Sequence, residues 1–139
     1  MAAVTWDATL IEKYNINGPR YTSYPTALAL HEQFAVADMQ TALATAPQEL
    51  SLYIHLPFCH QLCYYCGCNK VVTRHQAKAD VYLDALAREM AHYAGLLATR
   101  RIAAVHLGGG TPTFLTETQL SRLMQLVQQH FTLATTAEL

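Results

Sequence analysis

Apolar and polar residues alternate from residue 50 onward, which is the pattern of a β-strand with one buried face. One face of this strand would carry Leu50, Leu52, Ile54 and Leu56. The opposite face would carry Ser51, Tyr53 and His55. Pro57 has no backbone N–H to donate, and it therefore ends the predicted strand.

Helical periodicity appears in two later segments. The first spans about 77–97, where one apolar stripe contains Leu83, Leu86, Met90, Tyr93 and Leu97. A second apolar strand is expected at about 102–107, and three glycines close it. Thr116 and Gln119 then have the spacing of a capping box, which predicts the start of another helix. The apolar stripe of this last helix contains Leu120, Leu123, Met124, Val127 and Phe131.

Before residue 50 the sequence predicts two short helices separated by an extended arm or loop. The first helix spans about 6–14, and its N-cap is Thr5 or Asp7. The second spans about 36–46 and is stopped by Pro47. The residues that prevent regular structure between the two helices are Gly18, Pro19 and Pro25.

The order strand, loop, helix, strand, loop, helix from residue 50 predicts an α/β fold. Strands joined through helices become parallel neighbours, and their crossovers are right-handed. Two parallel strands leave unpaired sheet edges, and a third strand is expected beyond the last helix, after Leu139. We therefore expect residues 1–49 to form an arm with helices, and residues 50–139 to form the first units of a larger α/β barrel. A dimer that completes the sheet is the competing explanation.

Composition and charge exclude several classes of protein. The chain has 139 residues, of which 52% are hydrophobic and 14% charged, and its formal net charge is −1. This balance argues against a module that binds nucleic acid by neutralising phosphates. No apolar stretch is long enough to span a membrane, and the first residues do not resemble a secretory signal. We expect a soluble, cytoplasmic protein.

All four cysteines lie within one ten-residue loop, at Cys59, Cys63, Cys66 and Cys68. Disulfide frameworks spread their cysteines along a chain and belong to oxidising compartments, so this crowding favours metal or cluster ligands. A reduced set without a metal, or a disulfide formed on oxidation, remains possible. Zinc also remains an alternative, although structural zinc sites usually use two separated pairs of ligands.

An iron–sulfur cluster suits such a compact loop better than zinc does, because its irons accept thiolates at separate corners. Three ligands would leave one iron without a protein thiolate and open to chemistry, whereas four would close the cluster. The spacing Cys59-x3-Cys63-x2-Cys66, with Tyr65 before the third cysteine, resembles the signature of the radical S-adenosylmethionine (SAM) superfamily. That resemblance implies a 4Fe–4S cluster held by these three cysteines. It also implies SAM bound to the fourth iron, and one-electron cleavage of SAM to methionine and a 5′-deoxyadenosyl radical.

Four longer segments narrow the resemblance to the oxygen-independent coproporphyrinogen III oxidase family. The segments are 18–26 (GPRYTSYPT), 52–59 (LYIHLPFC), 66–70 (CGCNK) and 106–113 (HLGGGTPT). The resemblance implies that this chain is the N-terminal part of a partial (β/α)6 radical SAM barrel preceded by a helical and extended arm. It covers about the first third of that family's length.

The same resemblance implies an activity and its partners. Family members are monomeric cytoplasmic enzymes that use two SAM to convert two propionates of coproporphyrinogen III into vinyl groups, giving two CO2 and protoporphyrinogen IX. An electron donor such as flavodoxin or ferredoxin and an unidentified electron acceptor are implied as well. We expect these 139 residues alone to bind a labile cluster without turning over.

The resemblance also assigns roles to individual residues. Tyr53 would lie at SAM and near the chemistry, and His55 near the cluster. The positions implied to bind a second SAM are Tyr65 and Gly67, and those implied for the methionine part of SAM are Gly109, Gly110 and Thr111. Cys68 would lie near the cluster without being one of its three essential ligands. The N-terminal arm carries Arg20, Tyr21 and Tyr24, and the Arg20 guanidinium could pair with carboxylates of the substrate. An arm that only packs across the barrel is the alternative.

Ordinary structural explanations compete with several of these roles. Tyr53 and His55 could simply fill a barrel, a glycine triplet could form only a tight turn, and His106 is more often a core or lumen histidine than a ligand. Two other activities are also open, a radical SAM haem chaperone and a haem-degrading methyltransferase. A small zinc-binding interaction module is the alternative from a different class.

Overall fold

The computed structural model describes residues 6–16, 27–97 and 99–139, and it divides the chain into two compact units, Met1–Phe34 and Ala35–Leu139. In the first unit, helix α1 (Ala8–Tyr14) and the 3-10 helix η1 (Ala27–Ala29) are the regular elements among the described residues. Asp7 is the N-cap of α1, and its carboxylate accepts a hydrogen bond from the Leu10 amide at 3.0 Å. This agrees with one of the two predicted caps.

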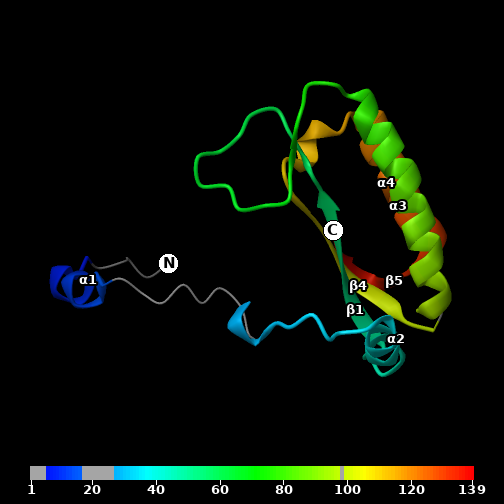
Figure 1. The fold of residues 1–139 in the computed structure, drawn as a ribbon, viewed down its shortest axis with the longest axis horizontal. Helices are drawn as coiled ribbons and strands as arrows, with labels where there is room; N and C mark the ends of the chain where they lie inside the picture. Colours follow the sequence, from blue (N-terminus) through cyan, green and yellow to red (C-terminus); the bar gives the residue numbers. More distant parts are fainter. Residues whose placement is uncertain (1–5, 17–26, 98) are drawn as a thin grey trace. The chain divides into compact units, whose positions relative to one another are not determined.

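The second unit contains the predicted alternation of strands and helices (Figure 1). Its elements are α2 (Val36–Ala44), β1 (Glu49–Leu56), β2 (Phe58–Cys59), β3 (Val71–Val72), α3 (Ala77–Leu96), β4 (Arg101–Gly109), η2 (Pro112–Phe114), α4 (Glu117–His130) and β5 (Thr132–Glu138). The boundary expected between residues 49 and 50 stays a prediction about domain organisation.

The strands β1, β4 and β5 form one parallel sheet in the order β1-β4-β5. The register places Tyr53 beside His106 and His55 beside Gly108. β5 corrects the sequence analysis, which expected the third strand only beyond Leu139. The segment is rich in Ala and Thr and has one large apolar residue before its end, Leu133, so it shows no alternation strong enough to predict a strand.

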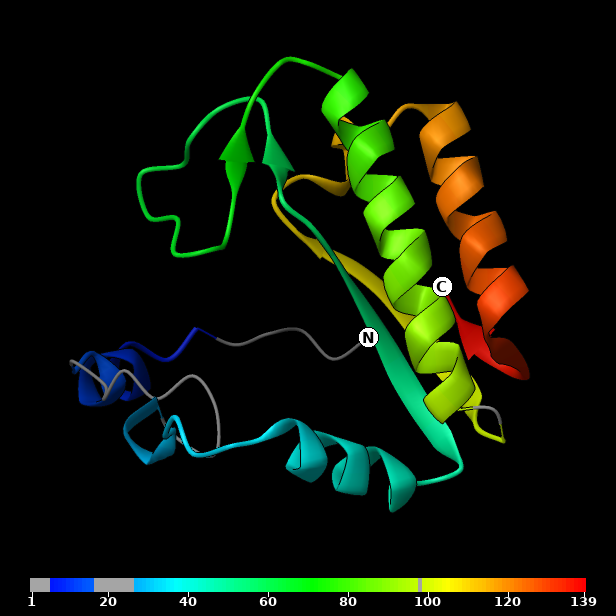
Figure 2. The same cartoon turned by 45° about the vertical axis from the view of Figure 1, so that its right-hand side comes forward.

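Helices α3 and α4 lie side by side and cover the same face of this sheet (Figure 2). The predicted apolar stripes point into this layer, where Leu83, Leu86, Leu123 and Val127 are buried. From β1, the buried residues are Ile54 and Leu56, as the alternation predicts. Two positions of the stripe predicted for α4 differ from the prediction. Leu120 is 39% exposed, and Phe131 is the C-cap of α4 with an extended backbone.

The C-terminal end of α2 is fixed to the segment before β4. The Arg100 guanidinium donates hydrogen bonds to the carbonyls of Ala44 and Ala46, at 2.6 and 3.2 Å. The last carbonyls of a helix lack partners within the helix, and a cation there also complements the helix dipole. The contact therefore holds α2 near the start of the sheet. None of the helices in the described ranges is both long and apolar enough to cross a bilayer.

Leu123 tests the packing between the helices and the sheet, because its side chain is fully buried. We expect Leu123→Ala to lower the free energy of unfolding by about 2–5 kcal/mol, through lost burial and the cavity left behind. Leu120→Ala, on the same helix but 39% exposed, should cost clearly less. Urea unfolding followed by circular dichroism measures both, and equal losses would contradict this account of the core.

Candidate cofactor site

A cavity of about 280 Å³ lies at the carboxyl ends of β1 and β4. It is lined by Cys59, Cys63, Tyr65, Cys66, Gly67, Cys68, Gly109, Gly110 and Thr111. The structure therefore brings together the three predicted cluster ligands and five of the six predicted SAM-binding residues. The exception is Tyr53, which lines a neighbouring cavity of about 560 Å³ together with His55.

The cysteine loop leaves the sheet through a short parallel pair formed by β2 and β3. Backbone hydrogen bonds close the base of the loop, from the Val71 amide to the Pro57 carbonyl at 2.7 Å and from the Thr73 amide to the Cys59 carbonyl at 2.9 Å. Cys59 is buried at this base, whereas Cys63 is exposed. The loop thus holds its first cysteine rigidly and carries the others farther out.

The glycine segment after β4 approaches this base closely. The Gly110 amide donates to the Leu56 carbonyl at 2.7 Å, and the Thr111 amide donates to the Phe58 carbonyl at 2.8 Å. A Cβ atom on Gly110 would lie 2.6 Å from the Phe58 carbonyl oxygen and 2.8 Å from the Cys59 sulfur. Glycine is therefore required here, because any side chain would collide with the backbone that carries Cys59.

Gly109 has a backbone φ of +102°, which side-chain-bearing residues rarely adopt. A Cβ atom on Gly109 would lie 2.7 Å from the His55 ring, and one on Gly108 would lie 2.7 Å from the Tyr53 ring. The glycine triplet is thus more than a tight turn. It leaves room for the two aromatic rings that β1 directs across β4.

Two hydrogen bonds assign the tautomer of the neutral His55 ring. Its Nε2 lies 2.7 Å from the Asn69 carbonyl oxygen, and its Nδ1 lies 3.1 Å from the Tyr53 hydroxyl. A carbonyl can only accept, so Nε2 carries the hydrogen, and in the neutral ring Nδ1 accepts from the Tyr53 hydroxyl. The ring therefore ties β1 to the far end of the cysteine loop.

Tyr82 of α3 contacts the same strand and lines the same cavity as Tyr53 and His55. Its hydroxyl donates to the His55 carbonyl at 2.5 Å. Burial raises the pKa of the Tyr82 hydroxyl, and the nearby charges of Glu89 and Tyr53 add to the increase. The phenol therefore stays protonated at neutral pH and remains a donor.

A positive charge lies within the cysteine loop. The Lys70 ammonium approaches the carbonyls of Cys66 and Cys68, at 3.5 and 3.3 Å. Thiolates and negatively charged clusters are favoured beside such a group. A hydrogen bond with Cys66 and the charge of Cys66 raise the pKa of the Cys68 thiol, although Lys70 opposes this increase. The Cys68 thiol therefore ionises less readily than a free cysteine thiol.

Thiols are the donor groups that the described structure gathers in this cavity. In the described part of the chain, no group of three His, Cys, Asp or Glu side chains could hold one metal ion. The three candidate ligands line one cavity, together with Cys68. Cysteine thiolates are the ligands of iron–sulfur clusters, so this donor set suits a 4Fe–4S cluster.

Sequence reasoning missed residues that support this site. Asn69 and Lys70 follow the last cysteine, but neither received a role because the interactions run through backbone carbonyls. Phe114 was also missed, although its ring stacks on Phe58 at 5.1 Å between centroids. His106 is exposed on β4, beside Tyr53 in the register, so it is not a core residue, and a position facing the barrel lumen stays a prediction. Arg20, Tyr21 and Tyr24 lie outside the described residues.

Comparison with known proteins gives a consistent family. The chain is 56% identical over 137 residues to an oxygen-independent coproporphyrinogen III oxidase of Salmonella typhimurium, and 51% identical over 140 residues to one of Mannheimia haemolytica, covering 96% of the latter. The chain belongs to the oxygen-independent coproporphyrinogen III oxidase family. No family model matches the sequence.

A solved structure supports the same family. It is coproporphyrinogen III oxidase (HemN) from Escherichia coli, described as a radical SAM enzyme, with a TM-score of 0.80 and 51% identity over 97% of this chain. Radical SAM enzymes imply SAM and a 4Fe–4S cluster as cofactors. The chain spans about 30% of the length of the Salmonella and E. coli relatives. The α/β fold with parallel strands therefore matches part of a radical SAM enzyme, as the sequence predicted.

Gly110 tests the close approach at this site. In protein without a cluster, we expect Gly110→Ala to lower the free energy of unfolding by about 1–3 kcal/mol. The new Cβ would clash with backbone carbonyl oxygens, which cannot rotate away as a side chain can. Gly67→Ala is the matched control, since a Cβ at Gly67 has no neighbour within 4 Å. Thermal unfolding measures both variants, and a Gly110→Ala protein as stable as the control would refute this geometry.

Proposed function

We propose that this chain forms the cluster-binding part of an enzyme that converts coproporphyrinogen III into protoporphyrinogen IX without oxygen. The observation that carries the proposal is the cavity that all four cysteines share with the glycine segment at the carboxyl ends of β1 and β4. Ligands of barrel folds bind at this end of the strands. Family membership adds the reaction and the substrate.

The proposed roles follow the geometry of the cavity. Cys59, Cys63 and Cys66 would hold the cluster, which when bound supplies one electron for cleavage of SAM. The groups proposed to hold two SAM molecules are Tyr53, Tyr65, Gly67, Gly109, Gly110 and Thr111. The glycine segment suits a close ligand because it presents backbone without side chains.

Tyr53 and His55 are the residues proposed to act near the chemistry. They line a cavity of about 560 Å³ beside the cluster site, and Tyr53 is 58% exposed to it and to solvent. The His55 bonds to Tyr53 and Asn69 fix the direction of both rings, so the Tyr53 hydroxyl can orient a ligand without moving the loop.

The overall change at each propionate is the loss of one hydrogen atom, one CO2 and one electron, which leaves a vinyl group. The hydrogen is taken from the propionate β-carbon, and an electron acceptor receives the remaining electron. The role of the protein is to position the groups and keep water and oxygen away. We propose a monomeric cytoplasmic enzyme served by a donor of the flavodoxin or ferredoxin type.

Replacing each cysteine tests the ligand assignment. After anaerobic reconstitution we expect Cys59→Ser, Cys63→Ser and Cys66→Ser to lose most bound iron and sulfide, because each removes one of three thiolates. Cys68→Ser should keep the iron content of the parent chain. Iron and sulfide analysis with the visible absorption spectrum decides, and zinc in place of iron would favour the interaction module instead.

A chimera tests the reaction itself. This chain would replace the matching 137-residue segment of the E. coli relative, to which it is 55% identical. With SAM, a reductant and no oxygen, we expect the chimera to form protoporphyrinogen IX and the same chimera with Cys59→Ser to form none. Chromatography of the oxidised porphyrins gives the readout. A reconstituted chimera that binds haem or transfers methyl groups without decarboxylation would overturn the proposed reaction.

A further inference from the structure

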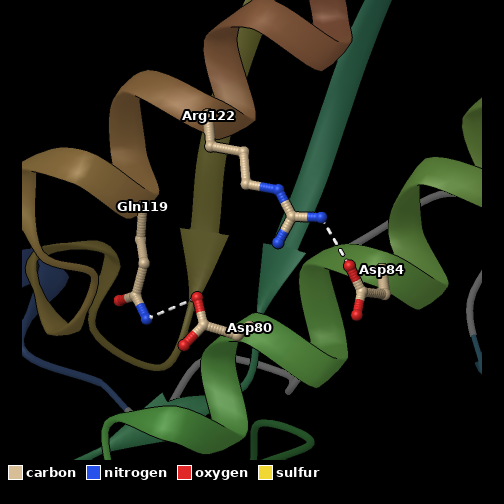
Figure 3. Close-up of polar contacts among 4 residues, drawn as sticks. All are labelled: Asp80, Asp84, Gln119 and Arg122. Atoms are coloured by element: carbon tan, nitrogen blue, oxygen red, sulfur yellow. Dashed lines mark hydrogen bonds and ion pairs between the residues drawn. The ribbon is translucent and has the colours of Figure 1, made fainter.

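A buried side-chain amide connects the two helices that follow the two loops of the cofactor site. Gln119 of α4 is only 6% exposed. Its carbonyl accepts from the Gln76 side-chain amide at 2.9 Å and from the Thr116 backbone amide at 3.1 Å. Its NH2 group donates to the Asp80 carboxylate at 3.0 Å (Figure 3). The same NH2 group also donates to the Gln76 backbone carbonyl at 3.4 Å, so the donors and acceptors of the Gln119 amide are all engaged.

The side-chain amide of Gln76 links Gln119 to the cofactor site. Gln76 is the N-cap residue of α3, and its NH2 group donates both to Gln119 and to the Phe114 carbonyl, the latter at 2.5 Å. Gln76 follows the cysteine loop, whereas Phe114 follows the glycine segment. The pair of amides thus joins the exits of two loops that are 38 residues apart in sequence.

Phe114 then contacts the residues on both sides of Cys59. Its ring stacks on Phe58 at 5.1 Å and lies 4.8 Å from the His60 ring. Phe58 also accepts the hydrogen bond from the Thr111 amide, and the Thr111 hydroxyl lies 3.9 Å from the Cys59 sulfur. Displacement of Phe114 would therefore move Cys59 and Thr111 together.

A second contact between the same helices reaches neither loop. Arg122 of α4 forms an ion pair with Asp84 of α3, one turn farther along, and both side chains are largely exposed (Figure 3). Exposed pairs of this kind contribute little to stability, whereas a buried polar group that loses its partner is costly. The exposed Arg122–Asp84 ion pair can therefore serve as the control for the buried hydrogen bonds of Gln119.

We propose that Gln119 is a positioning residue, which acts through Gln76 and Phe114 to hold Cys59 and the glycine segment at the separation the cofactors need. The inference deepens the proposed function and rests on it for its meaning. The protection of Cys59 that it predicts can nevertheless be measured in the protein without a cluster, and this measurement does not depend on the proposed function. Gln119 is not among the residues that line the cofactor cavity, so it acts through its neighbours.

The first test measures alkylation of each cysteine in the reduced, cluster-free chain, by mass spectrometry of the peptides. Exposed Cys63 serves as the internal reference for buried Cys59. We expect Gln119→Met, which keeps the side-chain size, to raise the Cys59 rate at least about tenfold beyond what its global stability loss explains. Arg122→Met should leave the Cys59 rate unchanged.

Two further variants separate positioning from simple destabilisation. Leu123→Ala removes a fully buried side chain on the same helix, and it should change Cys59 protection only as far as global unfolding allows. Gln119→Glu places a carboxylate against Asp80 and should expose Cys59. Adding Asp80→Asn supplies an amide donor for the new carboxylate. On a logarithmic scale of the Cys59 alkylation rate, this double variant should reverse at least half of the increase caused by Gln119→Glu.

The second test uses the reconstituted chain and the resonance spectrum of its reduced cluster, titrated with SAM. Gln119→Met should need about tenfold more SAM for the same spectral change at equal iron content, whereas Leu123→Ala should match the parent. A parent spectrum indifferent to SAM would refute the proposed function, while the Cys59 result would still stand. If the Cys59 alkylation rate of Gln119→Met is explained by its global stability alone, the positioning role is overturned, whatever the SAM titration gives.

Discussion

Parallel pairing of β1 with β4 is the constraint on which the candidate site depends. The pairing brings the carboxyl ends of both strands to one edge, and two more hydrogen bonds extend it beyond the sheet, from the Gly110 amide to Leu56 and from the Thr111 amide to Phe58. The cysteine loop and the glycine segment are thereby joined along their backbones. Because this contact has no room for a Cβ at Gly110, the glycine and the buried position of Cys59 require one another.

The polar contacts around this edge extend the same constraint into the helices. His55 ties β1 to Asn69 at the end of the cysteine loop, and Tyr82 of α3 holds the His55 carbonyl. On the other side, Gln76 and Gln119 connect the helix starts. Buried polar groups are costly when they lose their partners, so each contact fixes an orientation more than it adds stability. The site is therefore stiff at its base and open toward Cys63.

Much of this arrangement could be predicted from the sequence, because the hydrophobic periodicity is clearest in the segments whose apolar side chains are buried. The alternation of β1 and the stripe of α3 identified Leu56 and Leu83 as core, and Thr116 with Gln119 marked the start of α4. β5 escaped prediction because the β4–β5 pairing uses a stretch dominated by Ala and Thr. Backbone partners such as the Asn69 carbonyl also escaped, since any residue type can provide them.

Gln119 shows how a single residue can have a local role that the sequence reveals and a distant role that it hides. The capping box requires only the Gln119 carbonyl, which accepts from Thr116, and a glutamate would serve equally well there. The Asp80 carboxylate distinguishes the two, because it accepts a hydrogen bond from an amide and would repel a second carboxylate. The choice of glutamine over glutamate is therefore explained by the contact between the helices, and that contact continues through Gln76 to Phe114 and the base of the cysteine loop.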